Sequence, residues 1–308
     1  MILLLLLGCV ALASPEALAA DKAAAQSAAW WIWPLALFAA CFLLGIVAVP
    51  AGVGGGVLFV PIISGFFPFH LDFVRGAGLL VALAGAVSAG PHLLRSGLAN
   101  LRLALPLALV ASASSIAGAL LGLALPANVV QAALGATILG IVAIMALTRN
   151  SALPHVPAPD RLSQALGMHG IFRDGSDGRE IAWQVHRTPL GLALFGLIGF
   201  LAGMFGLGAG WANLPTLNLV MGVPLKVSAG TSSFILSMVD SSAAWIYLNQ
   251  GAVLPMIAVP SVIGMMLGAR IGARLLHVLP VIAVRRLVLA LLLFAGSRAL
   301  AKGLGVWD

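Results

Sequence analysis

Apolar runs long enough to cross a membrane follow one another from about residue 30 to about residue 302, and the polar residues gather between them. About 20 consecutive apolar residues cross the hydrocarbon core of a bilayer. The pattern predicts ten helical segments, in two sets of five around a polar stretch. We expect them near 31–50, 51–69, 73–94, 101–125, 128–147, 189–205, 206–222, 227–248, 252–276 and 281–301. In each set the second segment is short and is interrupted by Gly and Pro.

The two sets share one register. An offset of 154 residues carries the cluster from Gly52 to Gly56 onto the cluster from Gly206 to Gly210, and Pro61 onto Pro215. Chance would align roughly two such glycines and prolines, whereas seven glycines and three prolines coincide, so a tandem duplication is indicated. The coinciding pairs are Gly45/Gly199, Gly52/Gly206, Gly54/Gly208, Gly56/Gly210, Gly76/Gly230, Gly97/Gly251, Gly118/Gly272, Pro61/Pro215, Pro106/Pro260 and Pro126/Pro280.

The chain is predicted to have four parts: a signal peptide over 1–20, a first repeat over 30–148, a cytoplasmic linker over 149–188 and a second repeat over 189–302. The signal peptide rests on a short apolar run followed by Ala17-Leu18-Ala19, although no Lys or Arg precedes that run.

The linker is predicted to hold a short helix over Asp160–Leu166. Beyond the turn-like Asp174–Gly178 it is predicted to form a small hairpin, because apolar and polar residues alternate there. His155, His169 and His186 also lie in the linker, without the spacing of metal ligands.

Composition fixes the fold class. Of all residues 61% are hydrophobic and only 8% are charged, whereas a soluble domain carries about a quarter charged residues. Long apolar runs in lipid satisfy their backbone groups as helices. We therefore expect an all-α membrane protein, a polytopic bundle of about ten transmembrane segments. The net charge of +7 is attributed to membrane topology, so the expected partners are lipid and a small solute, and no nucleic acid.

Basic residues predict how the two repeats are oriented. If the chain starts outside and every segment crosses, twelve of the sixteen Lys and Arg residues face the cytoplasm. Arg95 and Arg102 flank a junction whose counterpart, Asn249-Gln250-Gly251, is uncharged. Equivalent loops then face opposite sides, which predicts inverted repeats with both termini outside the cytoplasm.

The two Gly-rich interruptions are the first candidate site. Backbone N–H groups at the start of a half-helix bind anions, and broken helices of inverted-repeat transporters bind substrate at mid-membrane. Close helix packing is the alternative, and it is favoured for Gly264, Gly268 and Gly272 and for Ser114, Gly118 and Gly122. The candidate substrate-binding residues are Gly52, Gly54, Gly55, Gly56, Arg75, Gly76, Gly206, Gly208, Gly210, Asn213, Thr231, Ser232 and Ser233.

Two charged residues stand out. Asp240 lies in the middle of an apolar segment, where a carboxylate usually lines a pathway or relays protons, and we expect it to couple transport to protons. The alternative is an acid neutralised by Ser237, Ser241 and Ser242. Arg75, at the outer end of its segment, either draws anions toward the site or pairs with Asp72.

The sequence resembles a known family in three of its glycine-rich patterns. The pattern Gly-x-Gly-Gly-Gly-x-x-x-x-Pro at 52–61, its copy Gly-x-Gly-Ala-Gly-x-x-x-x-Pro at 206–215 and Ser-Ala-Gly-Thr-Ser-Ser at 228–233 are similar to the sulfite exporter TauE/SafE family. Gly167–Gly170 and His186–Pro189 resemble a bacterial branch of it. The first repeat departs from the family pattern at Arg75-Gly76-Ala77, where small hydroxyl residues are more usual.

The resemblance implies a multi-pass permease for sulfite, sulfonates or related small anions. We expect a secondary transporter with no cofactor, no bound metal and no catalytic residues. A transporter of another small solute or of a metal ion is the alternative. A cation or metal transporter would need several buried acids, His or Cys, and only Asp240 qualifies. An intramembrane enzyme would need a second acid or a histidine at mid-membrane, and the sequence places neither there.

Overall fold

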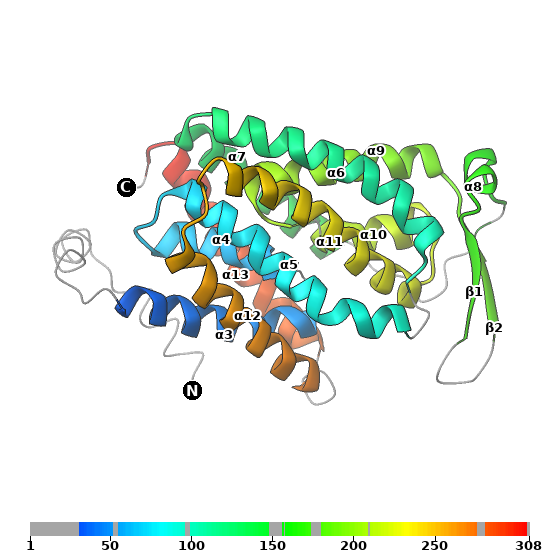
Figure 1. The fold of residues 1–308 in the computed structure, drawn as a ribbon, viewed down its shortest axis with the longest axis horizontal. Helices are drawn as coiled ribbons and strands as arrows, with labels where there is room; N and C mark the ends of the chain where they lie inside the picture. The colour runs from blue at the N-terminus through cyan, green and yellow to red at the C-terminus, as the bar shows by residue number, and fades with distance from the viewer. Residues whose placement is uncertain are drawn as a thin grey trace.

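A computed structural model describes residues 31–51, 55–95, 99–147, 156, 158–173, 180–208, 210–275 and 281–306. The predicted signal peptide, Gly52, Gly54 and His155 lie outside these residues. Long helices form the body of the molecule (Figure 1). The first half contains α3 (Ile32–Ala51), α4 (Gly55–Phe66), α5 (Leu71–Arg95), α6 (Leu101–Ala124) and α7 (Ala127–Leu147). The second contains α9 (Thr188–Phe205), α10 (Gly210–Pro215), the π-helical turn η1 (Thr216–Val220), α11 (Leu225–Asn249), α12 (Pro255–Leu275) and α13 (Val281–Gly303).

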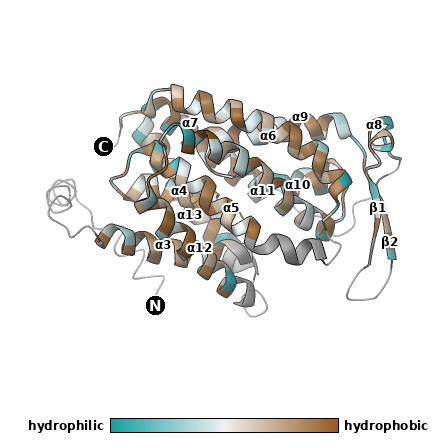
Figure 2. Cartoon of the chain, viewed as in Figure 1, coloured by the Kyte–Doolittle hydropathy of each residue, from teal (hydrophilic) through white to brown (hydrophobic). Residues whose placement is uncertain are grey.

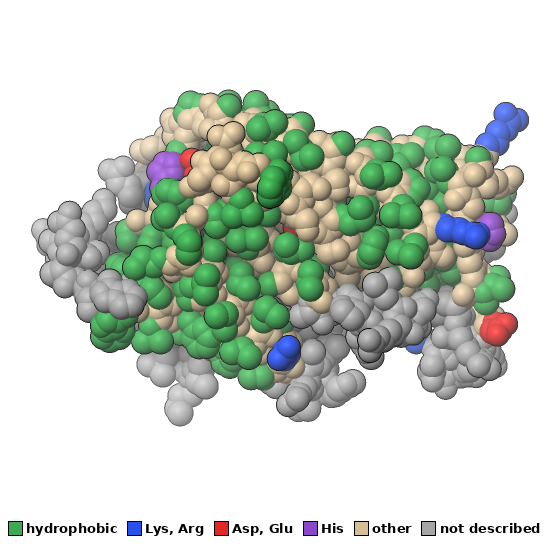
Figure 3. Space-filling model, in the orientation of Figure 1, with side chains coloured by type: hydrophobic (Ala, Val, Ile, Leu, Met, Phe, Trp, Pro, Cys, Tyr) green, Lys and Arg blue, Asp and Glu red, His purple; other side chains and the backbone are tan. Residues whose placement is uncertain are grey.

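Helices form where the apolar pattern predicts them, and the helix before the second glycine cluster ends at that cluster. The helix α9 ends at Phe205 because Gly206 and Gly208 adopt the left-handed conformation, with φ of 68° and 71°. Within the described residues, four stretches are long and apolar enough to cross a membrane: 101–124, 127–146, 188–205 and 255–272. Hydrophobic residues dominate along the helices (Figure 2), and most charged side chains on the face in Figure 3 lie toward its ends. The chain is a multi-pass membrane protein.

Equivalent helices of the two halves pack in the same way. The helix α3 packs along α12, and its counterpart α9 packs along α6, the counterpart of α12. A Cβ on the glycines between these helices would overlap backbone carbonyls of the neighbour, so only glycine allows this approach. Two pairs of contacts are related by the 154-residue offset: Gly45 on Met265 with Gly199 on Ala111, and Gly272 on Ile46 with Gly118 on Phe200. The packing role predicted for Gly264, Gly268, Gly272, Gly118 and Gly122 is confirmed.

Two equivalent pairs of helices run in opposite directions. Between α7 and α13, Gly135 contacts Leu300 near the end of α13, while Gly303 contacts Ala132 near the start of α7. Between α5 and α11, the start of one helix lies beside the end of the other. Gly76 packs on Ala252, and the Asn100 N–H donates to Thr231 Oγ1 at 3.2 Å. The two halves are therefore antiparallel along these elements.

The short second helix of each half folds back along the first. The Trp33 ring at the start of α3 meets the Phe67 ring just after α4, with centroids 5.9 Å apart. In the second half, the backbone N–H of His186 before α9 donates to the carbonyl of Met221 just after η1, at 3.2 Å. A helix of 12 residues such as α4 is about 18 Å long, shorter than a hydrocarbon core of about 30 Å. The helix α4 is therefore too short to cross the hydrocarbon core by itself.

The polar linker folds as its pattern predicts. The short helix α8 covers Arg161–Ala165, and β1 (His169–Arg173) pairs antiparallel with β2 (Glu180–Gln184). Figure 1 places this hairpin at the end of the helical body opposite the end of α13. Both predicted elements are confirmed, so the fold is mostly helical with one small hairpin.

Candidate functional site

The two Gly-rich interruptions meet inside the bundle. A Cβ on Gly56, at the start of α4, would lie 2.5 Å from the carbonyl oxygen of Leu207. On α5, a Cβ on Gly78 would lie 2.6 Å from the carbonyl oxygen of Gly206. The bare backbone of the second interruption therefore rests directly on α4 and α5 of the first half.

Other predicted glycines that the structure describes lie near this contact. Gly55 faces the Met265 side chain of α12, where a Cβ would lie 2.8 Å from Sδ. Gly206 lies against the backbone of Arg75, and Gly210 begins α10. Close packing and a helix break were the two alternatives for these glycines. Both occur at Gly206, which packs on Arg75 and ends α9.

Asp240 brings a carboxyl group to the second interruption. It is fully buried on α11, and its Oδ2 lies 3.2 Å from the position that a Cβ on Gly208 would take. The hydroxyl groups of its serine neighbours donate to carbonyls of their own helix. Ser237 donates to Phe234 at 2.7 Å, Ser241 to Ser237 at 2.6 Å and Ser242 to Met238 at 2.9 Å. The carboxyl group of Asp240 therefore lies beside the broken backbone at Gly208.

The hydroxyl residues after the second interruption lie near the start of α11. Thr231 is buried, and its Oγ1 accepts the Asn100 N–H from the start of α6. Ser232 is also buried, and Ser233 donates to the carbonyl of Ala229 at 3.2 Å. Thr231 thus joins the two halves, at the opposite end of α11 from Ala252.

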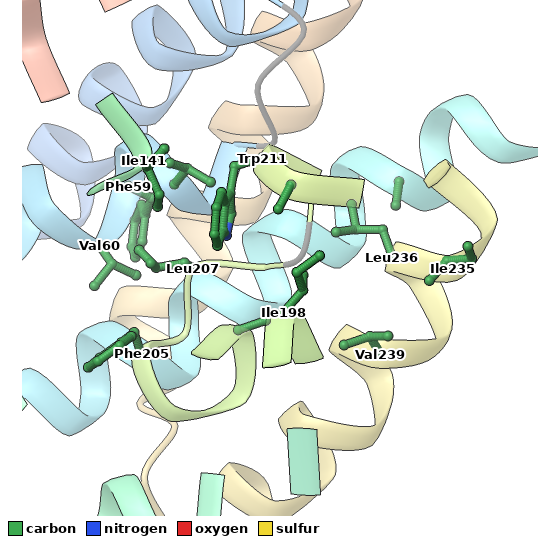
Figure 4. Packing of buried hydrophobic residues seen from close by; sticks show 14 of the residues in the cluster. Phe59, Val60, Ile141, Ile198, Phe205, Leu207, Trp211, Ile235, Leu236 and Val239 are labelled. Atoms are coloured by element: carbon green, nitrogen blue, oxygen red, sulfur yellow. The ribbon is translucent and has the colours of Figure 1, made fainter. Parts of the chain in front are cut away.

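The start of α10 carries two buried polar side chains, Trp211 and Asn213. Trp211 belongs to the buried cluster that also holds Phe59, Ile141 and Leu207, and Figure 4 shows its ring between α10 and these residues. Nε1 of Trp211 and both amide atoms of Asn213 have no hydrogen-bond partner among the residues that the structure describes. They are polar groups next to the interruption with unused hydrogen-bonding capacity.

Arg75 is tied into the protein on several sides. Its guanidinium donates to the carbonyls of Met204 at 2.8 Å and of Gly122 at 3.2 Å, and it forms an ion pair with Asp72. Those carbonyls belong to the last turns of α9 and α6, where a positive charge is favourable. Of the two roles considered for Arg75, the contact with Asp72 is present.

Tyr247 is a site residue whose role the sequence did not indicate. Its hydroxyl donates to the carbonyl of Gly203 at 3.1 Å, and its ring centroid lies 5.8 Å from the Arg75 guanidinium. Together these two side chains fix the end of α9 just before Gly206. A lone tyrosine in an apolar segment is the only sequence signal that could have suggested this.

Comparison with known proteins gives one family. The profile of the sulfite exporter TauE/SafE family matches residues 37–299. The chain is 28% identical over 240 residues to the probable membrane transporter protein ORF9 of Sinorhizobium sp., which covers 77% of this chain and 81% of that protein. It is 29% identical over 129 residues to the probable membrane transporter protein YunE of Bacillus subtilis, covering 41% of this chain and 46% of that protein. No solved structure matches the chain.

Proposed function

The chain belongs to the sulfite exporter TauE/SafE family and is a membrane transporter, and from this premise we propose that it carries a small oxyanion, sulfite or an organosulfonate. The proposed location is the bacterial inner membrane, with both termini in the periplasm. The observation that carries the proposal is the contact between the two interruptions, Gly56 on Leu207, beside the buried Asp240. Such a place offers backbone N–H groups to an anion away from water.

The proposed mechanism is alternating access between inverted repeats that cross the membrane ten times. It is supported by the antiparallel course of α5 against α11 and of α7 against α13. Rocking of one half against the other would open the contact between the interruptions first to one side and then to the other. The anion would rest on backbone N–H groups of Gly54–Gly56 and Gly208–Gly210 and on the hydroxyl groups of Thr231 and Ser232.

Asp240 is proposed to couple this movement to protons. An ionised carboxylate at Gly208 would repel an anion bound at the second interruption, because like charges in a low-dielectric site disfavour each other. Anion binding then requires that Asp240 be protonated. A proton would therefore move with the anion, and a proton gradient would drive transport.

The test is flux into proteoliposomes containing the purified full-length protein. Sulfite uptake should follow an imposed pH gradient in the wild type. Asp240→Asn should lose the response to the gradient yet keep the exchange of sulfite across the membrane, because a neutral amide mimics the protonated acid. Ser297→Ala, which removes an exposed hydroxyl on α13, is the control.

Three results would contradict the proposal. The first is absence of sulfite and sulfonate flux in the wild type. The second is chemical conversion of sulfite by the protein in detergent, which would indicate an enzyme. The third is uptake of divalent cations that sulfite does not compete with, which would indicate a metal transporter.

A further inference from the structure

Trp211 and Asn213 present hydrogen-bonding groups that the described part of the fold leaves unused. Asn213 is 0% exposed and Trp211 is 9% exposed. Burying an amide or an indole N–H without a hydrogen-bond partner destabilises the folded protein. Apolar residues at these positions would avoid that cost. Packing alone therefore does not explain why Trp211 and Asn213 occupy them.

The first half has avoided that cost at the matching positions. The 154-residue offset relates Trp211 to Val57 and Asn213 to Phe59, and both of those apolar side chains are fully buried. The same local geometry, a helix that starts after a Gly-rich break, therefore folds without a polar group. The polar groups of Trp211 and Asn213 are therefore not required for this region to fold.

We infer that Trp211 and Asn213 bind the carried anion, and that Asn213 selects an oxyanion bearing one hydroxyl group, the class to which hydrogen sulfite belongs. The inference rests on the proposed function, and it narrows the substrate. It adds Trp211 to the site and gives Asn213 a specific role.

The selection follows from the two open atoms of Asn213. The amide NH2 donates to an anionic oxygen, and the amide oxygen accepts a hydrogen bond. A singly protonated oxyanion supplies both partners, whichever way the amide is turned. A sulfonate or a fully deprotonated sulfite has acceptors alone, so the amide oxygen would stay buried and unpartnered. Trp211, a donor only, contributes equally to every one of these anions.

The test compares ligand binding by three full-length proteins in detergent: the wild type, Asn213→Leu and Trp211→Phe. The ligands are sulfite at a pH where hydrogen sulfite predominates, methanesulfonate and chloride. The wild type should bind hydrogen sulfite up to about tenfold more tightly than methanesulfonate. One hydrogen bond contributes up to about 1.4 kcal/mol, which corresponds to a factor of ten in the dissociation constant. Asn213→Leu should remove this preference. Trp211→Phe should weaken both ligands alike, by up to about tenfold, and keep the preference.

A second readout separates ligand binding from a structural role. If Asn213 only supported the fold, its replacement by Leu would lower the melting temperature of the ligand-free protein. If it binds the anion, the ligand-free melting temperature stays the same or rises, because an unpartnered buried amide has been removed. Trp245→Phe and Asn249→Leu change the same residue types at exposed positions of α11 and serve as matched controls.

The outcomes are distinct. Sulfite flux in vesicles, with both variants indistinguishable from their controls in binding, would overturn this inference and leave the proposed function standing. Equal binding of hydrogen sulfite and methanesulfonate by the wild type would also overturn it. Failure of the wild type to carry any of these anions would remove the proposed function itself.

Discussion

The two halves of the molecule share a scaffold and differ in chemistry. The glycines that seat α3 on α12 recur where α9 packs on α6, and they contact equivalent residues. The polar groups beside the interruptions do not recur, since the second half is polar where the first is apolar or bare. The contrasting pairs are Val57/Trp211, Phe59/Asn213, Ala77/Thr231, Gly78/Ser232 and Ala86/Asp240. A duplicated backbone thus keeps the glycines that its packing requires, while most polar side chains of the candidate site belong to the second copy.

Arg75 shows the same asymmetry in reverse. Its counterpart in the second half is Ala229. The start of α11 therefore has no arginine at the equivalent position, whereas the end that carries Tyr247 has a buried cation that holds the final turns of two helices. This cation matters for a protein whose halves are proposed to rock.

The largest effect is expected for Arg75→Met. It removes the donors to Met204 and Gly122 and leaves Asp72 without its cation. Breaking a buried pair costs about 3–5 kcal/mol, and since Asp72 is partly exposed we expect about 3 kcal/mol. Thermal unfolding in detergent measures it, with the exposed Arg286→Met as control. A loss as small as that of the control would show that this end is not held by Arg75.

The next largest loss of stability is expected for Gly118→Val and Gly272→Val, which change equivalent positions of the two halves. Each places a branched side chain against a backbone carbonyl, that of Phe200 or of Ile46, and overpacking of this kind costs about 1–3 kcal/mol or more. Because the two contacts are equivalent, the two losses should be similar. Gly140→Val, at a glycine of α7 with open space around it, should cost much less. Clearly unequal losses at 118 and 272 would break the equivalence of the scaffolds.

The smallest effect concerns how the first helix of each half begins. Burial tends to raise the pKa of Asp160, but the hydrogen bonds to Asp160 together outweigh burial and hold the pKa below its usual value. The largest of them is donated by the Thr188 hydroxyl at 2.8 Å. Because the folded pKa is lowered, the stabilisation is complete above the ordinary aspartate pKa and is lost as pH falls through the lowered one.

Thr188→Val should therefore destabilise the protein by up to about 1 kcal/mol at neutral pH, and by less as the solution is acidified. Trp33→Leu, which alters the aromatic contact at the start of α3, should cost the same at every pH in that range. Melting curves across the acidic range compare the two variants. An effect of Thr188→Val that does not change with pH would contradict the account of Asp160.

Much of the fold is readable from the sequence, because its signals are local. The apolar runs predict the helices, Gly206 and Gly208 predict the break after α9, and the alternation around Trp183 predicts the hairpin. The contacts are less readable, because they join backbone groups distant in sequence. Nothing near Arg75 indicates that its partners are the carbonyls of Met204 and Gly122.

The sequence indicates which segments hold the candidate site residues, but it does not predict how those residues lie relative to one another. Asp240 is conspicuous in its apolar segment, but its approach to Gly208 depends on how α11 packs against the interruption. Trp211 is equally explained, from sequence, as an interfacial anchor. Only the structure shows it buried with its Nε1 unused. Substrate, proton coupling and membrane orientation remain predictions that experiment must test.

The central claim is that the two halves lie inverted in the membrane, and it can be measured directly. Arg102 and Met256 are equivalent under the 154-residue offset, and both are exposed at the starts of α6 and α12. Each would be changed to Cys in a background with Cys9 and Cys41 replaced by Ala, and labelled with a membrane-impermeant thiol reagent on intact cells. We predict labelling at 256 from the periplasm, and labelling at 102 only after the membrane is opened. Labelling of both from the same side would contradict the inverted arrangement and the mechanism that depends on it.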